Sequence, residues 1–249
     1  MKVIVQNIAT EYLDEGHGPV LLFLHGWKDT LHSFDVNVME LKSSFRVVRL
    51  DLPGFGSTEA PKAAWDVGQY VAFVKDFIEK LELHVEAMIG HSFGGRIILK
   101  GAGSNQLLAN KIILIGSAGI VKNKDLKHSV LKFFAKIVSV VLLVPPFSLI
   151  SGKLKKWFYS RIGSDYMGTG ELKETFKLVI NEDLQKYAKT IQIPTLLVWG
   201  ENDASTPVSD ARLFETLIHN SKLTVLPDAG HFVHREKAEE VTTIIKNFL

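Results

Sequence analysis

The chain has 249 residues, of which 46% are hydrophobic, so it carries enough apolar surface to bury a sizeable core. Its formal net charge of +2 gives no reason to expect a nucleic-acid partner. It contains no cysteine, which excludes disulfides, a thiol nucleophile and a cysteine-based zinc site. The first residues include no long apolar run followed by a cleavage site, so we expect no secretory signal and a cytoplasmic protein.

Short apolar strands alternate with amphipathic helices over most of the chain. This alternation predicts an α/β fold with a mostly parallel central sheet flanked by helices. In such sheets, ligand sites lie beyond the carboxyl ends of the strands. After a predicted hairpin at 2–14, we place strands near 20–24, 45–50, 85–90, 111–115, 194–199 and 222–226, and helices at 67–81, 93–102, 207–218 and 235–248.

The alternation stops between residues 120 and 190. A structureless loop of this length is improbable in a compact domain, and the apolar and charged pattern predicts helices instead. The segment contains thirteen Lys or Arg and six Asp or Glu, a net charge of +7, which leaves −5 for the rest of the chain. This positive charge could favour substrates that are anionic or close to a membrane. The alternative is that these lysines simply lie on helix faces exposed to solvent.

One part of this segment, Phe133–Ile150, is apolar enough to require a membrane test. Lys136 interrupts the apolar run, and Pro145 and Pro146 break any helix that enters it. We therefore expect a buried or amphipathic helix that ends at the prolines, and no stable membrane insertion. A helix lying in the membrane interface is the alternative.

The most informative motif is Gly90-His91-Ser92-Phe93-Gly94, which lies between a predicted strand and a predicted helix. A serine on such a tight turn adopts a strained backbone conformation, and side chains two residues before and after it would collide. Glycine at both positions leaves the necessary room. The turn also places Ser92 at a helix N-terminus, where free N–H groups and the helix dipole favour negative charge. This pattern is typical of a nucleophile elbow.

Further motifs follow the other predicted strands: His25-Gly26-Trp27, the loop that begins at Asp51, Asp203 and His231. With their order of serine, acid and histidine, these motifs resemble the α/β-hydrolase superfamily over nearly the whole chain. The resemblance implies an α/β-hydrolase fold with a core domain of residues 1–119 and 191–249. It also implies that residues 120–190 form an inserted helical cap, or lid, over the active site.

The resemblance further implies a catalytic triad of Ser92, His231 and Asp203. A free hydroxyl is a weak nucleophile, so Ser92 needs a base such as His231 within hydrogen-bond reach. His231 in turn needs an acid that fixes its tautomer and stabilises the imidazolium. Asp203 fits the family pattern, while Asp228 is the rival. We favour Asp203 because Asp228 lies only three residues before His231 and is too close to approach the ring squarely.

By the same resemblance, the backbone N–H groups of Phe93 and Trp27 form the oxyanion hole. We expect Trp27, Phe93 and Phe232 to line the substrate pocket, although a purely structural Trp27 is the alternative. Several other polar residues near the motifs are expected to be structural: His25, His91, His234 and Asp51.

A serine at the elbow argues against haloalkane dehalogenases and epoxide hydrolases, which use aspartate there in this superfamily. We therefore expect a serine carboxylesterase that cleaves small-molecule esters with short or medium acyl chains, without a metal or organic cofactor. A carbon–carbon hydrolase of ring-fission products, a lipase and a non-catalytic small-molecule-binding protein are the alternatives. The first of these needs a cation in the pocket, for which Arg161 or a lysine of the cap is a candidate. The oligomeric state is left open.

Overall fold

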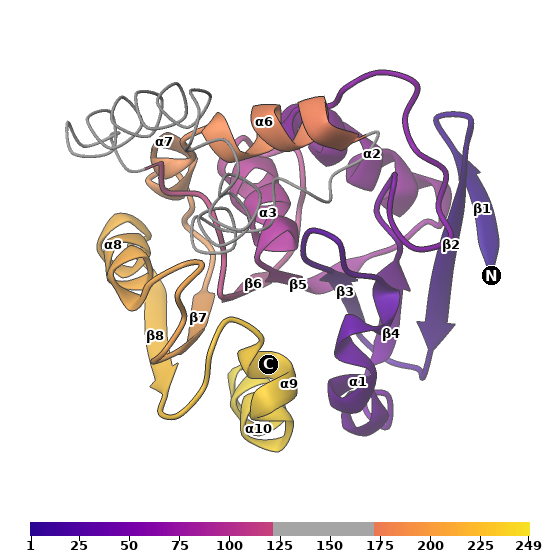
Figure 1. The fold of residues 1–249 in the computed structure, drawn as a ribbon. Coiled ribbons are helices and arrows are strands. Elements are labelled where there is room, and N and C mark those ends of the chain that lie inside the picture. The colour runs from indigo at the N-terminus through magenta and orange to yellow at the C-terminus, as the bar shows by residue number, and fades with distance from the viewer. Residues whose placement is uncertain (122–171) are drawn as a thin grey trace, which may run out of the picture.

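A computed structural model describes residues 1–121 and 172–249 of the chain. Its centre is a sheet of eight strands in the spatial order β1-β2-β4-β3-β5-β6-β7-β8 (Figure 1). From β4 to β8 all neighbouring strands are parallel, whereas β1 and β2 are antiparallel at one edge. The strands are β1 (Lys2–Val5), β2 (Ile8–Glu15), β3 (Val20–Leu24), β4 (Arg46–Leu50), β5 (Val85–His91), β6 (Lys111–Ile115), β7 (Thr195–Gly200) and β8 (Ser221–Leu226). The predicted hairpin and all six later strands are confirmed.

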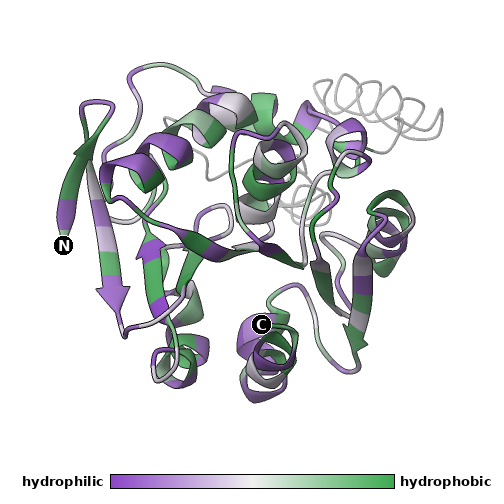
Figure 2. Cartoon of the chain, turned by 180° about the vertical axis from the view of Figure 1, so that it is seen from behind, coloured by the Kyte–Doolittle hydropathy of each residue, from purple (hydrophilic) through white to green (hydrophobic). Residues whose placement is uncertain are grey.

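Helices cover both faces of this sheet, as the apolar runs of the inner strands require. Leu21 and Phe23 of β3 point into one hydrophobic core, while Leu22 and Leu24 point into the other. The first core is closed by α1 (Asp35–Leu41) and α10 (Ala238–Phe248). The second is closed by α2 (Val67–Lys80), α3 (Phe93–Gly103) and α8 (Val208–Leu217). Figure 2 shows the apolar sides of these helices turned toward the sheet.

The predicted C-terminal helix is interrupted, which the sequence pattern did not indicate. A short helix, α9 (Val233–Glu236), is separated from α10 by Lys237, whose backbone has a φ of −129° and a ψ of 47°. The Glu236 carboxylate accepts hydrogen bonds from the N–H groups of Gly230 and Phe232. These bonds tie α9 to the loop that carries His231, so α9 belongs to the site rather than to the helix that follows.

Of the predicted insertion, the described residues are 120–121 and the last part, 172–190. It contains two helices, α6 (Lys173–Asn181) and α7 (Gln185–Ala188), while Phe133–Ile150 and Arg161 lie outside the described residues. Leu184 and Ala188 are buried in the same core as α2 and α3. The division of the chain into a core and a cap stays a prediction. In the described part of the chain, no helix is both long and apolar enough to cross a membrane.

Candidate active site

Ser92 occupies a strained turn between β5 and α3. Its φ is 49° and its ψ is −104°, a left-handed conformation that costs a non-glycine residue about 1–3 kcal/mol. A Cβ atom on Gly94 would lie 2.1 Å from the Leu24 carbonyl oxygen, and one on Gly90 would lie 2.7 Å from the Gly94 carbonyl carbon. The two glycines therefore allow the tight approach of strand and helix that holds Ser92 in this conformation, half-exposed at the end of β5.

His231 and Asp203 meet beside this turn, although they follow different strands. His231 lies after β8 and Asp203 after β7, and the His231 Nδ1 atom is 2.8 Å from Asp203 Oδ2. The Asp203 side chain is fully buried, while that of His231 is 15% exposed. This geometry gives the imidazole a fixed carboxylate partner on Nδ1 and leaves its Nε2 side for another group.

The local structure keeps the Asp203 carboxylate ionised. Burial acts to raise the pKa of Asp203, but hydrogen bonds from His231 and Thr206 outweigh it and hold this pKa below its ordinary value. The N–H groups of Ser205 and Thr206 each lie 2.8 Å from Oδ1, and the Thr206 hydroxyl lies 2.7 Å from Oδ2. A negative charge beside His231 is therefore present throughout the neutral range.

Ser92 and His231 both line a cavity of about 290 Å³ at the carboxyl ends of the strands. The three residues predicted to line the pocket also lie along this cavity. Aromatic rings form much of its wall: the Trp27 ring centroid is 5.2 Å from that of Phe93 and 5.1 Å from that of Phe176. The other described residues around it come mainly from α3, α6 and the loops after β7 and β8: Gly26, His91, Arg96, Ala118, Val179, Ile180, Ser205, Thr206 and Phe232.

The backbone around Ser92 leaves two N–H groups available at this cavity. Phe93 is the first residue of α3, and Trp27 lies in the turn after β3. Within the described residues neither backbone N–H donates a hydrogen bond, whereas the neighbouring Gly94 N–H donates to the His25 carbonyl oxygen at 3.0 Å. The first turn of a helix has such free donors, and the helix dipole adds a favourable field for an anion there.

The rival acid and the expected structural residues occupy other positions. Asp228 is exposed in the turn after β8, with a φ of 54°. The Asp51 carboxylate instead accepts hydrogen bonds from the N–H groups of Leu31 and Ser57, at 2.7 and 2.8 Å. His25 accepts a hydrogen bond from the Leu52 N–H at Nε2. Asp51 and His25 therefore organise loops next to the site.

His91 and His234 lie next to each other in the interior behind His231. Their ring centroids are 4.4 Å apart, and His91 is 4.8 Å from the ring of His231. The Nε2 atom of His91 lies 3.0 Å from the His231 carbonyl oxygen, and that of His234 lies 3.0 Å from the Ser33 hydroxyl. Burial lowers the pKa of both rings, to about 3 for His234, so both are neutral at physiological pH.

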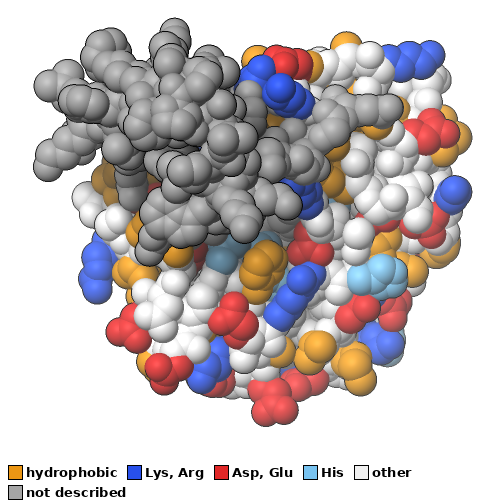
Figure 3. Space-filling model, viewed as in Figure 1, with side chains coloured by type: hydrophobic (Ala, Val, Ile, Leu, Met, Phe, Trp, Pro, Cys, Tyr) orange, Lys and Arg blue, Asp and Glu red, His pale blue; other side chains and the backbone are white. Residues whose placement is uncertain are grey.

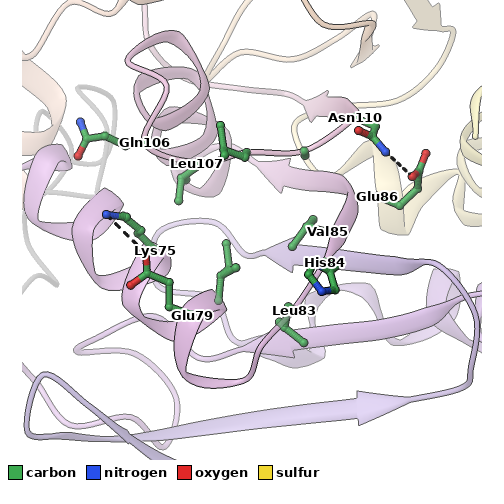
Figure 4. A pocket seen from close by; sticks show the side chains of 12 residues that line it. Lys75, Glu79, Leu83, His84, Val85, Glu86, Gln106, Leu107 and Asn110 are labelled. Carbon is green, nitrogen blue, oxygen red and sulfur yellow. Dashed lines mark hydrogen bonds and ion pairs between the residues drawn. The ribbon is translucent and has the colours of Figure 1, made fainter.

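A larger cavity, of about 540 Å³, lies away from this chemistry (Figure 4). It is lined by the start of β5 and the loop at 106–110, at the amino end of the parallel strands. Four of its polar side chains form two pairs: Lys75 with Glu79 at 3.5 Å, and Asn110 with Glu86 at 2.7 Å. On the face seen in Figure 3, basic and acidic side chains are interspersed rather than gathered by sign.

Three residues of the smaller cavity were not anticipated from the sequence. Thr206 supports Asp203, Phe176 of α6 packs on Trp27, and Arg96 of α3 is a buried cation on the cavity wall. The spacing in the sequence does indicate Arg96, because it lies four residues after Ser92 and therefore one helical turn along the same helix face. Nothing in the sequence indicated which residues of the distant α6 would meet Trp27.

Comparisons with known proteins identify the family to which the chain belongs. Residues 21–244 match the model of the "Alpha/beta hydrolase family". The "AB hydrolase superfamily protein YisY" of Bacillus subtilis is 27% identical, over 94% of this chain and 93% of the relative. Human epoxide hydrolase 4 is also 27% identical, over 93% and 72% of the two chains. The crystal structure of the enol-lactonase from Burkholderia xenovorans LB400 superposes with a TM-score of 0.77 at 19% identity, covering 100% of this chain and 99% of that one. The chain belongs to the alpha/beta hydrolase family.

Proposed function

We propose that this protein is a serine carboxylesterase that cleaves short- or medium-chain carboxylic esters. The observation that carries the proposal is the strained Ser92 at the edge of a cavity that it shares with His231, whose Nδ1 atom is paired with the buried Asp203 carboxylate. A serine, a histidine and a buried carboxylate together perform acyl transfer on several unrelated folds. We therefore derive the reaction from these three side chains.

The Ser92 hydroxyl oxygen attacks the ester carbonyl while His231 takes its proton at Nε2. Asp203 holds the Nδ1–H of the ring and stabilises the imidazolium that forms. The N–H groups of Phe93 and Trp27 donate to the developing oxyanion, and each such donor is worth about 3 kcal/mol of the barrier. His231 then gives its proton to the leaving alcohol, and a water activated by the same ring hydrolyses the acyl-enzyme.

The cavity supports a small acyl group. At about 290 Å³ it lies at the lower end of the volumes of ligand pockets. The rings of Trp27, Phe93 and Phe176 give it an apolar wall that suits a hydrocarbon chain. A long acyl chain would have to extend out of this space, so we expect the rate to peak at short or medium chains.

The relatives share one fold but are named for several different reactions. A lactone is a cyclic ester, so the reaction named for the enol-lactonase breaks the same bond type as the one proposed here. Epoxide hydrolase 4 is named for a different substrate. Epoxide opening in this superfamily uses an aspartate at the elbow, and this chain has Ser92 there, which favours the ester reaction.

The proposal is tested with p-nitrophenyl esters from acetate to palmitate, on the wild type and on Ser92→Ala. Ser43→Ala, which alters an exposed serine after α1, is the matched control. We expect turnover that peaks at short or medium chains, is lost in Ser92→Ala and is unchanged in Ser43→Ala. A rate that rises only above the solubility of the long esters would replace this proposal with a lipase. A folded protein that turns over no ester would refute it.

A further inference from the structure

Arg96 is a buried cation on the wall of the Ser92 cavity. Only 4% of its surface is exposed, and its side chain lines the cavity together with those of Ser92 and His231. The Arg96 backbone N–H donates to the Ser92 carbonyl oxygen at 3.2 Å, so Arg96 lies one helical turn beyond the serine. One turn of helix corresponds to a rise of about 5.4 Å, which is within reach of a small substrate.

The guanidinium has no carboxylate partner among the described residues. Its Nη2 atom donates to the Glu182 carbonyl oxygen, while its Nε–H is buried and without a partner there. The Glu182 carboxylate lies 2.6 Å from the Lys100 ammonium group. The carboxylate of Asp183 accepts two hydrogen bonds from Gln185, each at 2.9 Å. The acids closest to Arg96 are therefore occupied by other groups.

A buried charge without an ion-pair partner is unfavourable unless something compensates it. Burial lowers the pKa of Arg96 to about 10, against the opposing effect of Glu182 and Asp183, so the side chain remains charged at neutral pH. A second donor in the same cavity is also unsatisfied: the indole Nε1–H of Trp27 is buried without a partner. Two buried, unpartnered donors next to a candidate nucleophile indicate a ligand with acceptor oxygens.

We propose that the Arg96 guanidinium binds a carboxylate on the acyl part of the substrate, so that the enzyme prefers monoesters of short dicarboxylic acids. This inference rests on the proposed esterase function and specifies its substrate class. The planar guanidinium donates two parallel hydrogen bonds to a carboxylate, which a neutral ester group cannot match. The carboxylate would supply the missing partner of the buried charge, and it would fix the reacting carbonyl relative to Ser92.

The alternative role of Arg96 is purely structural. Its Nη2 bond to the carbonyl of Glu182, the residue directly after α6, ties α3 to the end of that helix. The two roles predict different behaviour toward substrates. A structural tie supports the cavity whatever the substrate, so its loss lowers the turnover of charged and neutral esters alike. A carboxylate-binding residue affects the charged ester alone.

Monomethyl and dimethyl glutarate separate these roles, because they share one acyl chain and differ at its far end, which is a charged carboxylate in the first and a neutral methyl ester in the second. Methanol release is measured on the wild type, Arg96→Gln and Arg96→Lys. Arg212→Gln is the control, because it removes the same charge from the exposed face of α8. We expect the wild type to prefer the monoester. Arg96→Gln should lower kcat/KM for the monoester about ten- to a hundredfold, mainly through KM, since charged hydrogen bonds are of this strength. Turnover of the diester should stay within about twofold.

Arg96→Lys should recover part of the preference for the monoester, and Arg212→Gln should behave as the wild type does. A wild type that prefers the diester, or an equal loss of both activities in Arg96→Gln, would overturn the inference. A binding measurement separates this result from a failure of the esterase proposal. Calorimetry with glutarate on Ser92→Ala, with and without Arg96→Gln, tests the carboxylate site even where no ester is turned over. Binding that does not depend on Arg96 would refute the site.

Discussion

The Asp203 carboxylate accepts hydrogen bonds from several groups besides His231. Both of its oxygens accept: Oδ1 from the N–H groups of Ser205 and Thr206, and Oδ2 from His231, with the Thr206 hydroxyl at 2.7 Å. A carboxylate fixed in this way has one orientation toward the imidazole. Asp228, three residues before His231, is exposed and offers no such geometry. The structure thus gives a physical reason to prefer Asp203 as the acid.

At the residue scale, exchanging each acid for its amide discriminates between the two candidates. Asp203→Asn keeps the size of the side chain but removes the charge that fixes the His231 tautomer, so we expect kcat to fall by about four orders of magnitude. Asp228→Asn should change kcat by less than twofold. Steady-state hydrolysis of p-nitrophenyl butyrate measures both variants. The reverse order of effects would identify Asp228 as the acid.

At the scale of elements, the junction of β3, β5 and α3 positions the serine. The first turn of α3 approaches the end of β3 so closely that the Gly94 N–H donates to the His25 carbonyl oxygen. On the other side, the Ser92 N–H donates to the Ile115 carbonyl oxygen at the end of β6 at 3.0 Å. The backbone, rather than the side chain, therefore determines where the hydroxyl lies.

Because the backbone is so closely packed at this junction, we expect a single added methyl group to destabilise it. In Gly94→Ala the new Cβ atom would lie 2.1 Å from the Leu24 carbonyl oxygen, a backbone atom that cannot move without the strand. We expect a loss of several kcal/mol in the free energy of unfolding, together with loss of activity. Urea denaturation followed by circular dichroism measures the first effect.

Gly68→Ala in the first turn of α2 is the control, because its closest atoms belong to the side chains of Asp66 and Lys100. We expect its free energy of unfolding to change by less than about 1 kcal/mol. Equal stability of the two alanine variants would contradict the proposed role of the close packing at Gly94.

At the scale of the whole molecule, three histidines that are buried in the described part of the chain make the fold sensitive to acid. Burial lowers the pKa of His25, His91 and His234 in the folded protein, whereas the unfolded chain has ordinary imidazoles with a pKa near 6.5. Below that pH the unfolded chain binds more protons than the folded one. The free energy of unfolding is therefore retained above pH 6.5 and falls as the pH drops below it, and each histidine adds to the slope while the pH stays above its pKa in the folded protein.

Urea titrations at pH 7.5, 6.5, 5.5 and 4.5 measure this dependence. We expect a shallow profile above pH 6.5 and a steep decline below it. His234→Gln should reduce the slope because one proton fewer is taken up on unfolding, while His219→Gln, at an exposed position, should leave the slope unchanged. A free energy of unfolding that stays constant from pH 7.5 to 5.5 would contradict this interpretation.

Much of this architecture follows from local sequence. The inner strands are continuous apolar runs because both faces of a parallel sheet are covered, and the residues of the site follow strand ends within a few positions. Ser92 was found from its glycines, and Asp203 and His231 from their place after late strands. The break at Lys237 was not predicted, because neither glycine nor proline marks it. The position of Phe176 depends on contacts between distant elements, which periodicity alone does not specify.

The most direct test of the central claim, that Ser92 is an activated nucleophile, is covalent labelling with a fluorophosphonate. The probe forms a bond with a serine that a neighbouring base activates, without requiring knowledge of the natural substrate. Mass spectrometry of the digested protein then locates the adduct. We expect one adduct, on Ser92, that is abolished in Ser92→Ala and strongly slowed in Asp203→Asn. A folded protein that remains unlabelled, or an adduct that persists in Ser92→Ala, would contradict the account.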